Sequence, residues 1–547
     1  MKKLLSYMRS SFRHDLIAGI VVGLVALPLA IAFAVASGAR PEQGIYTSII
    51  AGIAIGLASG SKFQVSGPTG AFVIILLGIV NAFGIGGLLI AGCMAGIILV
   101  LMGLFRFGSI IKYIPYPVII GFTSGIGLLI FTSQLSHFFG ISSVEKPHGW
   151  IQMLTMLFHH LPRDINVSSL AVGSITLFVS LFWRKIHQTF PAAPIALLVG
   201  TILSLFLGHT PVVGAIPTGL PHFQLLNFSW SWIPILLPSA FTIAVLGAIE
   251  SLLSAIVADG MAGTKHNSNQ ELIAQGVGNI IIPFFGGIPA TGAIARTAMN
   301  IRNGAKTRMA SVVHSIVLIV IVLFFAPYAE HIPMAALAAI LMVVAYRMSE
   351  AHHFRKLLTA PLPDVFVLLT TFFLTLFVDL TIAVGAGVVL ASLLFIKNVS
   401  EITINTLEDN TQTGSSAALA LRERVKDYPL ISLYEVNGPM FFGAASFLED
   451  QIAHKQHEIL ILTLKNVPVI DASAMHALDL IVEDIQQNNG KIILVSLQPQ
   501  VLRALWRHGT IQKLGGEDFV ARNIDEAIER AKEMINQSSS QGNLFTT

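Results

Sequence analysis

The sequence is poor in charged residues and holds almost no cysteine. Charged residues make up 12% of its 547 positions, against roughly 25% in an average soluble domain, which argues against a soluble cytoplasmic enzyme. Its one cysteine, Cys93, lies inside an apolar run, so an intrachain disulfide and a zinc site built on a cysteine cluster are both excluded. The basic residues form no single stripe, and nucleic-acid binding is therefore not expected.

Charge is also divided unevenly along the chain. Residues 1–400 contain 21 Lys/Arg and 11 Asp/Glu, whereas residues 401–547 contain 12 and 19. The first part is sparsely charged and basic, and the second is more densely charged and acidic. This division predicts a transmembrane domain at 15–399, preceded by a short cytoplasmic segment at 1–14 and followed by a soluble part.

Long uncharged stretches predict the membrane spans. A spanning helix needs about 20 mostly apolar residues, and stretches such as 16–39, 63–105 and 186–249 reach that length at least once. Counted in this way, the transmembrane domain makes about 14 passes. The stretch at 16–39 is too long for the apolar part of a signal peptide, so it is expected to stay in the membrane.

Basic residues set the expected orientation. Lys2, Lys3, Arg9 and Arg13 precede the first span, and short basic flanks stay in the cytoplasm. With an even number of passes, both termini are then cytoplasmic. We therefore expect a multi-pass protein of the cell (inner) membrane, surrounded by lipid.

Two matching breaks interrupt the apolar text. The run SGPTGA at 66–71 is echoed by IPATGA at 288–293, and each precedes an apolar, helix-compatible segment. Interrupted segments at matching places in two halves are typical of a transporter site. Two helix starts aimed at one spot would present free N–H groups and positive dipole ends, which bind anions. A pair of ordinary loop-to-helix turns is the alternative.

Two charges are expected at membrane depth. Glu250 follows a long apolar run, and Arg296 lies one turn beyond the second break. Ser254 is one turn after Glu250 and on the same helical face. Such ionisable residues are candidate functional groups, because each is costly in a membrane without a partner or water. A structural ion pair between Glu250 and Arg296 is the alternative, and it does not exclude transport.

The soluble part has strand and helix patterns in alternation, which predicts a small α/β domain at 429–536. Asp471 is expected to cap a helix start. A linker at 400–428 precedes this domain, and the polar segment at 537–547 is expected to be disordered. The α/β domain contains neither of the two glycine-rich motifs that bind phosphate, G-x-x-x-x-G-K-[ST] and G-x-G-x-x-G. The expected strands are 430–436, 458–465 and 491–496. The expected helices are 444–454, 472–487, 498–507 and 524–534.

With these residues, the chain resembles the SulP family of anion transporters, which includes vertebrate relatives such as prestin. The resemblance covers essentially the whole length, as a membrane domain followed by a STAS domain. The matching text is LPLAIAFA at 27–34, SGPTG at 66–70, GAIESLL at 247–253, NSNQEL at 267–272 and PATGAIART at 289–297.

The resemblance implies an α-helical polytopic membrane protein with 14 transmembrane segments in two inverted seven-segment repeats. These form a core and a gate domain, and the protein is expected to be a homodimer. The third and tenth segments would be half-helices whose N-termini bind the anion. Carried over by position, the residues that border or face the anion are Leu29, Phe33, Thr69, Gly70, Ala71, Ile294, Ala295 and Arg296.

The resemblance also concerns the coupling ion and the tail. In similar sodium-coupled bicarbonate transporters, residues at the positions of Glu250 and Ser254 hold the cation, whereas members that look proton-coupled also carry Glu. A proton suits Glu250 if hydrocarbon surrounds it, and sodium suits it if oxygen atoms do. No cofactor beyond that ion is expected. Ser473 aligns with the phosphorylated serine of related STAS domains, although Ala472 and Ala474 depart from the pattern.

Together these features predict cation-coupled secondary transport of a small inorganic oxyanion, sulfate or bicarbonate. A dicarboxylate is the alternative substrate, and an exchanger or channel on the same fold is the alternative mechanism. No ATP-binding motif supports a pump, and no acyl-transfer or phosphoryl-transfer motif supports a membrane-bound enzyme.

Overall fold

The computed structural model divides the chain into two compact units, Met1–Val389 and Leu390–Thr547. The residues that it describes are 11–109, 114–141, 150–160, 164–186, 191–214, 219–226, 230–378, 380–401, 404–405, 431–441 and 458–542. Residues 1–10 of the segment expected at 1–14, and the helix expected at 444–454, lie outside these residues.

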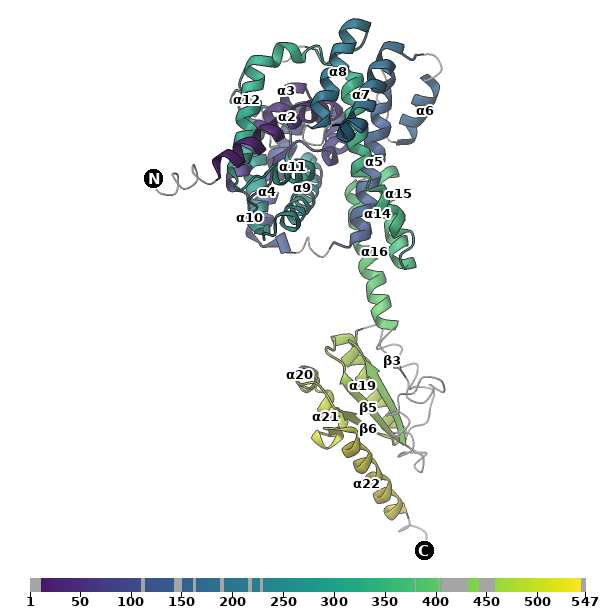
Figure 1. The fold of residues 1–547 in the computed structure, drawn as a ribbon. Helices are drawn as coiled ribbons and strands as arrows, with labels where there is room; N and C mark the ends of the chain where they lie inside the picture. The colour runs from purple at the N-terminus through teal and green to yellow at the C-terminus, as the bar shows by residue number, and fades with distance from the viewer. Residues whose placement is uncertain are drawn as a thin grey trace, which may run out of the picture. The chain divides into compact units, whose positions relative to one another are not determined.

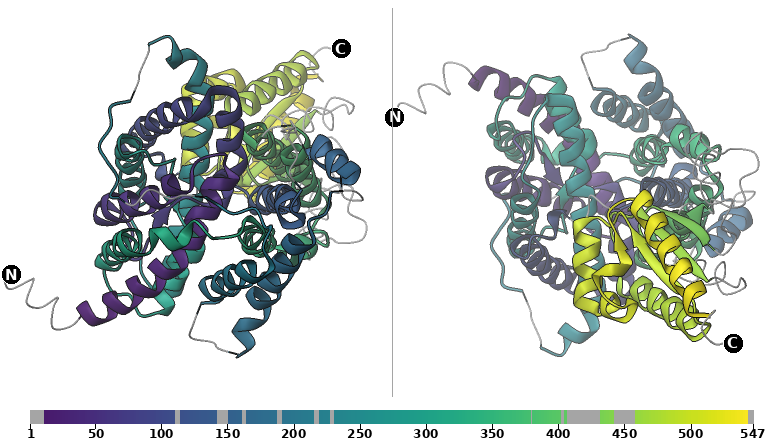
Figure 2. Two further views of the ribbon diagram at one scale, coloured as in Figure 1. Left: turned by 90° about the horizontal axis from the view of Figure 1, so that it is seen from above. Right: turned by 90° about the horizontal axis from the view of Figure 1, so that it is seen from below.

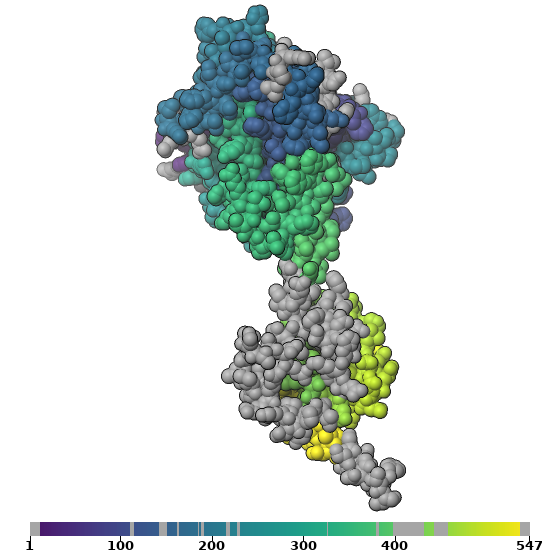
Figure 3. Space-filling view, turned by 90° about the vertical axis from the view of Figure 1, so that its right-hand side faces the viewer, coloured from purple at the N-terminus to yellow at the C-terminus, as the bar shows by residue number. Residues whose placement is uncertain are grey.

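The helices of the first unit form two packed groups (Figures 1 and 2). The first group comprises α2 (Phe12–Ala36), α3 (Pro41–Ala58), α4 (Val73–Leu104), α9 (Trp232–Ala262), α10 (Ser268–Ile281), α11 (Ile294–Arg302) and α12 (Met309–Ala329). The second group comprises α5 (Tyr116–Phe139), α6 (Trp150–His160), α7 (Val167–Ile186), α8 (Ala192–Leu207), α13 (Met334–Met348), α14 (Ala351–Leu357) and α15 (Leu362–Phe377). α16 (Leu380–Glu401) follows α15. In the space-filling view, blue and green surfaces of the second group cover the face turned to the viewer (Figure 3).

Several helices of this unit match a bilayer in length and composition. Among the described residues, 5 helices are long and apolar enough to cross a membrane, and further apolar helices are shorter. The stretch at 63–105, expected to make two passes, contains a break at Gly84 inside α4. Gly84 has φ +68°, a conformation that side chains rarely adopt. The 14 passes and their inverted repeat cannot be counted on these helices and stay a prediction.

Glycines bring the helices of the first group into close contact. A methyl group at Gly96 of α4 would come within 2.7 Å of the Gly276 carbonyl oxygen, and one at Gly276 of α10 within 2.6 Å of the Gly96 carbonyl oxygen. A methyl at Gly44 of α3 would lie 2.1 Å from the Ala30 carbonyl oxygen of α2. Small residues are what membrane helices use for such packing, because lipid gives no hydrophobic drive for their association.

The second unit is a five-stranded sheet in the order β3-β4-β5-β6-β7. β4 to β7 are parallel, and β3 pairs antiparallel with β4. Alternate residues of the central strands face two cores: one packs against α19 to α21 and the other against α22. The elements are β3 (Ile404–Asn405), β4 (Ile431–Asn437), β5 (Ile459–Asn466), α19 (Ala472–Gln487), β6 (Lys491–Val495), α20 (Pro499–His508), α21 (Thr510–Leu514), β7 (Val520–Ala521) and α22 (Ile524–Gly542).

The second unit agrees with the sequence patterns in most of its elements. Asp471 caps α19, since its side chain accepts a hydrogen bond from the Ala474 N–H. Two differences concern the ends. The short strand β3 lies within the expected linker at 400–428. Helix α22 continues to Gly542, into the segment expected to be disordered.

Asp479 on α19 holds α21 in place. Its carboxylate accepts hydrogen bonds from Thr510 Oγ1 and Lys513 Nζ, both at 2.7 Å. Burial by itself would raise the pKa of Asp479, but these donors outweigh it and keep the pKa below its ordinary value. The carboxylate therefore favours folding above its unfolded pKa of about 3.9, and that contribution is lost as the pH falls through the lower folded pKa.

We expect Asp479→Asn to loosen α21 by about 1–3 kcal/mol at pH 7, because Lys513 and Thr510 then lose a charged acceptor. Hydrogen exchange of the full chain, followed in peptides that cover Thr510–Leu514, measures this loss. The difference from wild type should begin to shrink below about pH 4, where the unfolded carboxylate is protonated, and should vanish as the pH falls through the lower folded pKa of Asp479. Glu529→Gln, on the exposed side of α22, is the control, and equal protection in the Asp479 variant would contradict the prediction.

Candidate functional site

The two sequence breaks lie side by side in the structure. β1 (Ser66–Gly67) pairs antiparallel with β2 (Thr291–Gly292). Two further hydrogen bonds extend the contact: the Ala293 N–H donates to the Val65 carbonyl oxygen at 3.0 Å, and the Val65 N–H donates to Thr297 Oγ1 at 3.1 Å. Segments far apart in the sequence thus meet at one place in the first group.

A helix starts directly after each of these short strands. Gly70–Phe72 forms a 3₁₀ turn that continues into α4, and α11 begins at Ile294. The amides of a helix's first turn have no acceptor within the helix, so both starts offer free N–H groups. Thr69, Gly70 and Ala71 are buried, whereas Ile294 and Ala295 are exposed. The structure therefore pairs the short strands that precede the two helix starts, and anion binding by the six predicted backbone positions stays a prediction.

Helix α2 contributes the two apolar residues assigned to the site. Phe33 is 5% exposed, and a methyl group at Gly70 would lie 3.4 Å from its Cε1. Phe33 therefore contacts the start of the first half-helix. Leu29 lies one turn earlier on the same helix and is also buried. Pro28 stands inside α2 next to it.

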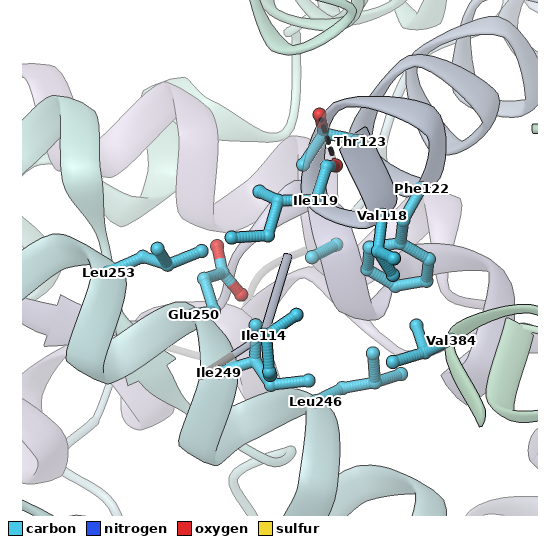
Figure 4. A pocket seen from close by; sticks show the side chains of 11 residues that line it. Ile114, Val118, Ile119, Phe122, Thr123, Leu246, Ile249, Glu250, Leu253 and Val384 are labelled. Carbon is cyan, nitrogen blue, oxygen red and sulfur yellow. Dashed lines mark hydrogen bonds between the residues drawn. The ribbon is translucent and has the colours of Figure 1, made fainter. Parts of the chain in front are cut away.

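Glu250 on α9 reaches the first helix start. Thr69 Oγ1 donates a hydrogen bond to Glu250 Oε2 at 2.9 Å. The rest of the carboxylate's surroundings are a largely apolar cavity between α9 and α5, with Val384 of α16 at its far side (Figure 4). Its lining residues are Ala71, Ile114, Val118, Ile119, Phe122, Thr123, Leu246, Ile249, Leu253 and Val384. The cavity beside Glu250 is thus lined mainly by hydrocarbon.

Ser254 contacts the second half-helix. It is fully buried, and its hydroxyl donates to Thr297 Oγ1 on α11 at 3.2 Å. Ser251, next to Glu250, contacts the second break, because its Oγ lies 3.0 Å from Thr291 Oγ1 and accepts from the Gly292 N–H. These hydroxyls join α9 to the second half-helix.

Arg296 lies behind the first helix start and not in an open part of the site. Its side chain is 2% exposed. The guanidinium donates to the Pro68 carbonyl oxygen and, at 3.5 Å, to Ser48 Oγ of α3. The residue therefore ties the second half-helix to the turn that precedes the first. Within 4.0 Å, the ion-pair contacts among the described residues do not include one between Arg296 and Glu250, so the alternative of a structural ion pair is not seen.

Two buried carboxylates hold the segments beside the half-helices by hydrogen bonds. The sequence patterns assign no role to either of them. Asp15 at the start of α2 accepts from the backbone N–H groups of Lys306 and Thr307, after α11. Glu271 on α10 is fully buried and accepts five hydrogen bonds, from Ser59, Gly60, Ser61, Gln64 and Gln275. In the sequence, Glu271 stands out only as part of the family text; a carboxylate in an apolar segment is the signal that could have found it.

We expect Arg296→Ala to weaken anion binding about tenfold or more, because it removes a buried positive charge and leaves the Pro68 carbonyl and Ser48 hydroxyl unpaired, at a cost of about 1–3 kcal/mol. Arg302→Ala is the matched control, since Arg302 ends the same helix and is less buried. Binding affinity measured for both purified variants tests this expectation. Equal losses would mean that position along α11 does not matter.

Comparison with known proteins adds independent observations. A model described as "Sulfate permease family" matches residues 12–371, and one described as "STAS domain" matches residues 422–531. The chain is 45% identical over 525 residues to the "Putative sulfate transporter YvdB" of Bacillus subtilis, covering 94% of this chain and 97% of that one. It is 30% identical over 550 residues to the "Bicarbonate transporter BicA" of a Picosynechococcus species, with 95% of each chain covered.

Solved structures agree with this picture. The transmembrane domain of a cyanobacterial bicarbonate transporter BicA is 32% identical, with a TM-score of 0.62, and the match covers 68% of this chain and 97% of that one. The structure of SLC26A9 has a TM-score of 0.83 at 19% identity and covers 98% and 93% of the two chains. The second likeness concerns the fold alone.

Proposed function

This chain belongs to the sulfate permease family, and from that premise we propose that it imports a small inorganic oxyanion, sulfate or bicarbonate, by cation-coupled secondary transport with alternating access. It is an integral, multi-pass membrane protein with a C-terminal STAS domain, and its relatives are transporters and not enzymes. The anion would bind at the two helix starts, held by backbone amides at Thr69 to Ala71 and at Ile294 to Arg296.

The hydrogen bond between Thr69 and Glu250 carries this proposal. It places a carboxylate beside the first helix start, at 2.9 Å from a side chain of the proposed anion site. An anion and an ionised carboxylate repel each other at such close quarters. The anion and the Glu250 carboxylate can be present together only if Glu250 binds a cation. This requirement would couple transport of the anion to transport of the cation.

The membrane potential explains why coupling is needed. An anion that enters a negative-inside cell is opposed by about 2.3 kcal/mol per charge per 100 mV, so import requires an accompanying cation. The apolar cavity around Glu250 supports the proton, because hydrocarbon offers no oxygen ligands for sodium. Leu246, not a second carboxylate, stands one turn before Glu250.

The remaining assignments belong to the same proposal. We infer a homodimer in the cell (inner) membrane with both termini cytoplasmic, and a STAS domain that regulates transport or assembly, with exposed Ser473 at the start of α19 as the candidate phosphorylation site. A dicarboxylate remains the alternative substrate, and an exchanger or channel the alternative mechanism.

Counterflow in proteoliposomes tests the proposal. Vesicles loaded with unlabelled sulfate should accumulate labelled sulfate transiently and with saturation, which a carrier does and a channel does not. A competition panel of bicarbonate, fumarate and chloride then ranks the substrates. Competition by fumarate alone would contradict the oxyanion and indicate a dicarboxylate as the substrate. Flux that does not saturate would contradict a carrier and indicate a channel.

A further inference from the structure

His314 on α12 is a buried histidine inside the first helical group. Its side chain is 0% exposed, and neither ring nitrogen has a hydrogen-bond partner among the described residues. Buried polar groups in folded proteins are nearly always paired, so an unpaired one calls for an explanation. An ionisable residue inside a membrane domain is moreover a candidate functional group. His314 has no part in the site described above.

The ring lies where α12 packs against α3. A methyl group at Gly52 of α3 would come within 2.9 Å of His314 Nδ1, so a larger residue there would fill the space beside the ring. On the other side, a methyl at Gly23 of α2 would lie 3.2 Å from the His314 carbonyl oxygen. Gly52 is one helical turn after Ser48, the residue that accepts from the Arg296 guanidinium.

The Arg296 guanidinium lies about one turn of α3 from the ring, because it donates to Ser48 while the ring lies beside Gly52. The other charged groups of the packed helices are further away along their axes. Glu42 precedes Gly52 by ten residues, about 15 Å, and Asp15 precedes Gly23 by eight, about 12 Å.

The remaining ionisable groups on these elements are also at a distance or already paired. Arg308 precedes His314 by six residues, about 9 Å, and donates to the Ser61 carbonyl oxygen. His14 stands beside Asp15 at the start of α2, and Tyr46 lies in the second turn of α3, with its hydroxyl toward Gly219. The electrostatic field at the His314 ring therefore comes mainly from the Arg296 guanidinium and from any ion bound near that guanidinium.

Occupancy of the anion site would reverse the electrostatic balance at His314. With the site empty, a proton on the ring would stand near the Arg296 charge in a dry interior, which is unfavourable. A doubly charged anion at the helix starts would oppose that single positive charge. Protonation of the ring would then stabilise the bound anion, and by linkage the anion would favour protonation equally.

We propose that His314 is a second proton-binding group of the transport domain, taken up together with a doubly charged anion. This inference rests on the proposed function in its proton-coupled form. With one proton on Glu250 and one on His314, a divalent oxyanion such as sulfate enters the membrane domain without net added charge. A singly charged anion needs only the Glu250 proton, so His314 would distinguish the two classes of anion by stoichiometry.

The test counts protons taken up per sulfate bound. Calorimetry of the purified full chain in two buffers of different ionisation enthalpy gives this number for each variant. We expect His314→Gln to bind one proton fewer than wild type. In the Glu250→Gln background about one proton per sulfate should remain, and the double variant should bind none. His331→Gln, at an exposed position beside Glu330, is the control and should match wild type.

Each outcome decides the inference. An unchanged proton count in His314→Gln overturns it and leaves the residue a packing group. If that variant does not fold, Glu250→Gln still decides, because loss of all proton uptake in that protein also overturns it. Sulfate binding without any proton uptake by wild type overturns the inference and proton coupling together. Absence of sulfate binding by wild type overturns the inference and leaves bicarbonate as the proposed substrate.

Discussion

Replacement of Gly70 by valine is expected to abolish anion uptake while the protein still folds and assembles. A methyl group at Gly70 would lie 2.8 Å from Met348 Sδ and 3.4 Å from both Ile130 Cδ1 and Phe33 Cε1. These neighbours are the ends of flexible side chains, so the fold can accommodate the change. The free amides of the first helix start, however, would be covered by the two added methyl groups of valine, and an anion could not reach them.

Uptake of labelled sulfate into proteoliposomes measures this effect, and the expected rate is that of liposomes without protein. Gly78→Val is the matched control, because Gly78 lies on the same helix and a methyl group there would meet none of the described neighbouring residues within 4 Å. Gly70→Ala should give an intermediate rate, since a single methyl displaces mainly Met348. Normal transport by the valine variant would remove the first helix start from the site.

Glu250→Gln is expected to abolish accumulation of a singly charged anion such as bicarbonate driven by a cation gradient, while exchange of one anion for another continues. Glutamine has the shape of glutamate and can still accept a hydrogen bond from Thr69, so the anion site is preserved. It carries no charge, and therefore neither a proton nor sodium binds to it. At 100 mV, loss of one coupled charge is worth about 2.3 kcal/mol, or about 50-fold in the accumulation of a singly charged anion.

The measurement is uptake across an imposed pH gradient, first without sodium and then with a sodium gradient alone. Wild-type accumulation in the first condition identifies the proton, and accumulation only in the second identifies sodium. Glu330→Gln, at an exposed position, controls for loss of a carboxylate as such. Unimpaired accumulation by Glu250→Gln would exclude Glu250 from coupling, whichever ion is used.

The pairing of the two breaks could be predicted because it depends on local chemistry. Proline and glycine before an apolar segment mark a helix start wherever they occur, and the repeated Thr-Gly-Ala links the two places. The direction of long side chains could not be predicted in this way. Arg296 is expected at the border of the anion, yet its guanidinium contacts Pro68 and Ser48, and Ser254 contacts Thr297. Such contacts depend on tertiary packing between helices far apart in the sequence.

In the soluble domain the same limit applies to short elements. β4, β5 and β6 agree with the sequence patterns within one or two residues, because each has a run of alternating or fully buried apolar residues. β3 and β7 have 2 residues each, which is too few for any period to be recognised. They form the two edges of the sheet, where β3 pairs with β4 and β7 pairs with β6.

The ladder between β1 and β2 has a mechanical consequence for the first helical group. Its two strands come from distant parts of the chain and are joined by buried hydrogen bonds, while Glu271 and Asp15 fasten the segments on either side. The two half-helices cannot part without breaking several of these bonds at once. The binding geometry is therefore stiff, whereas the boundary at Gly70 is formed by flexible side-chain ends. A movement that leaves this ladder intact would carry both half-helices together with the first group.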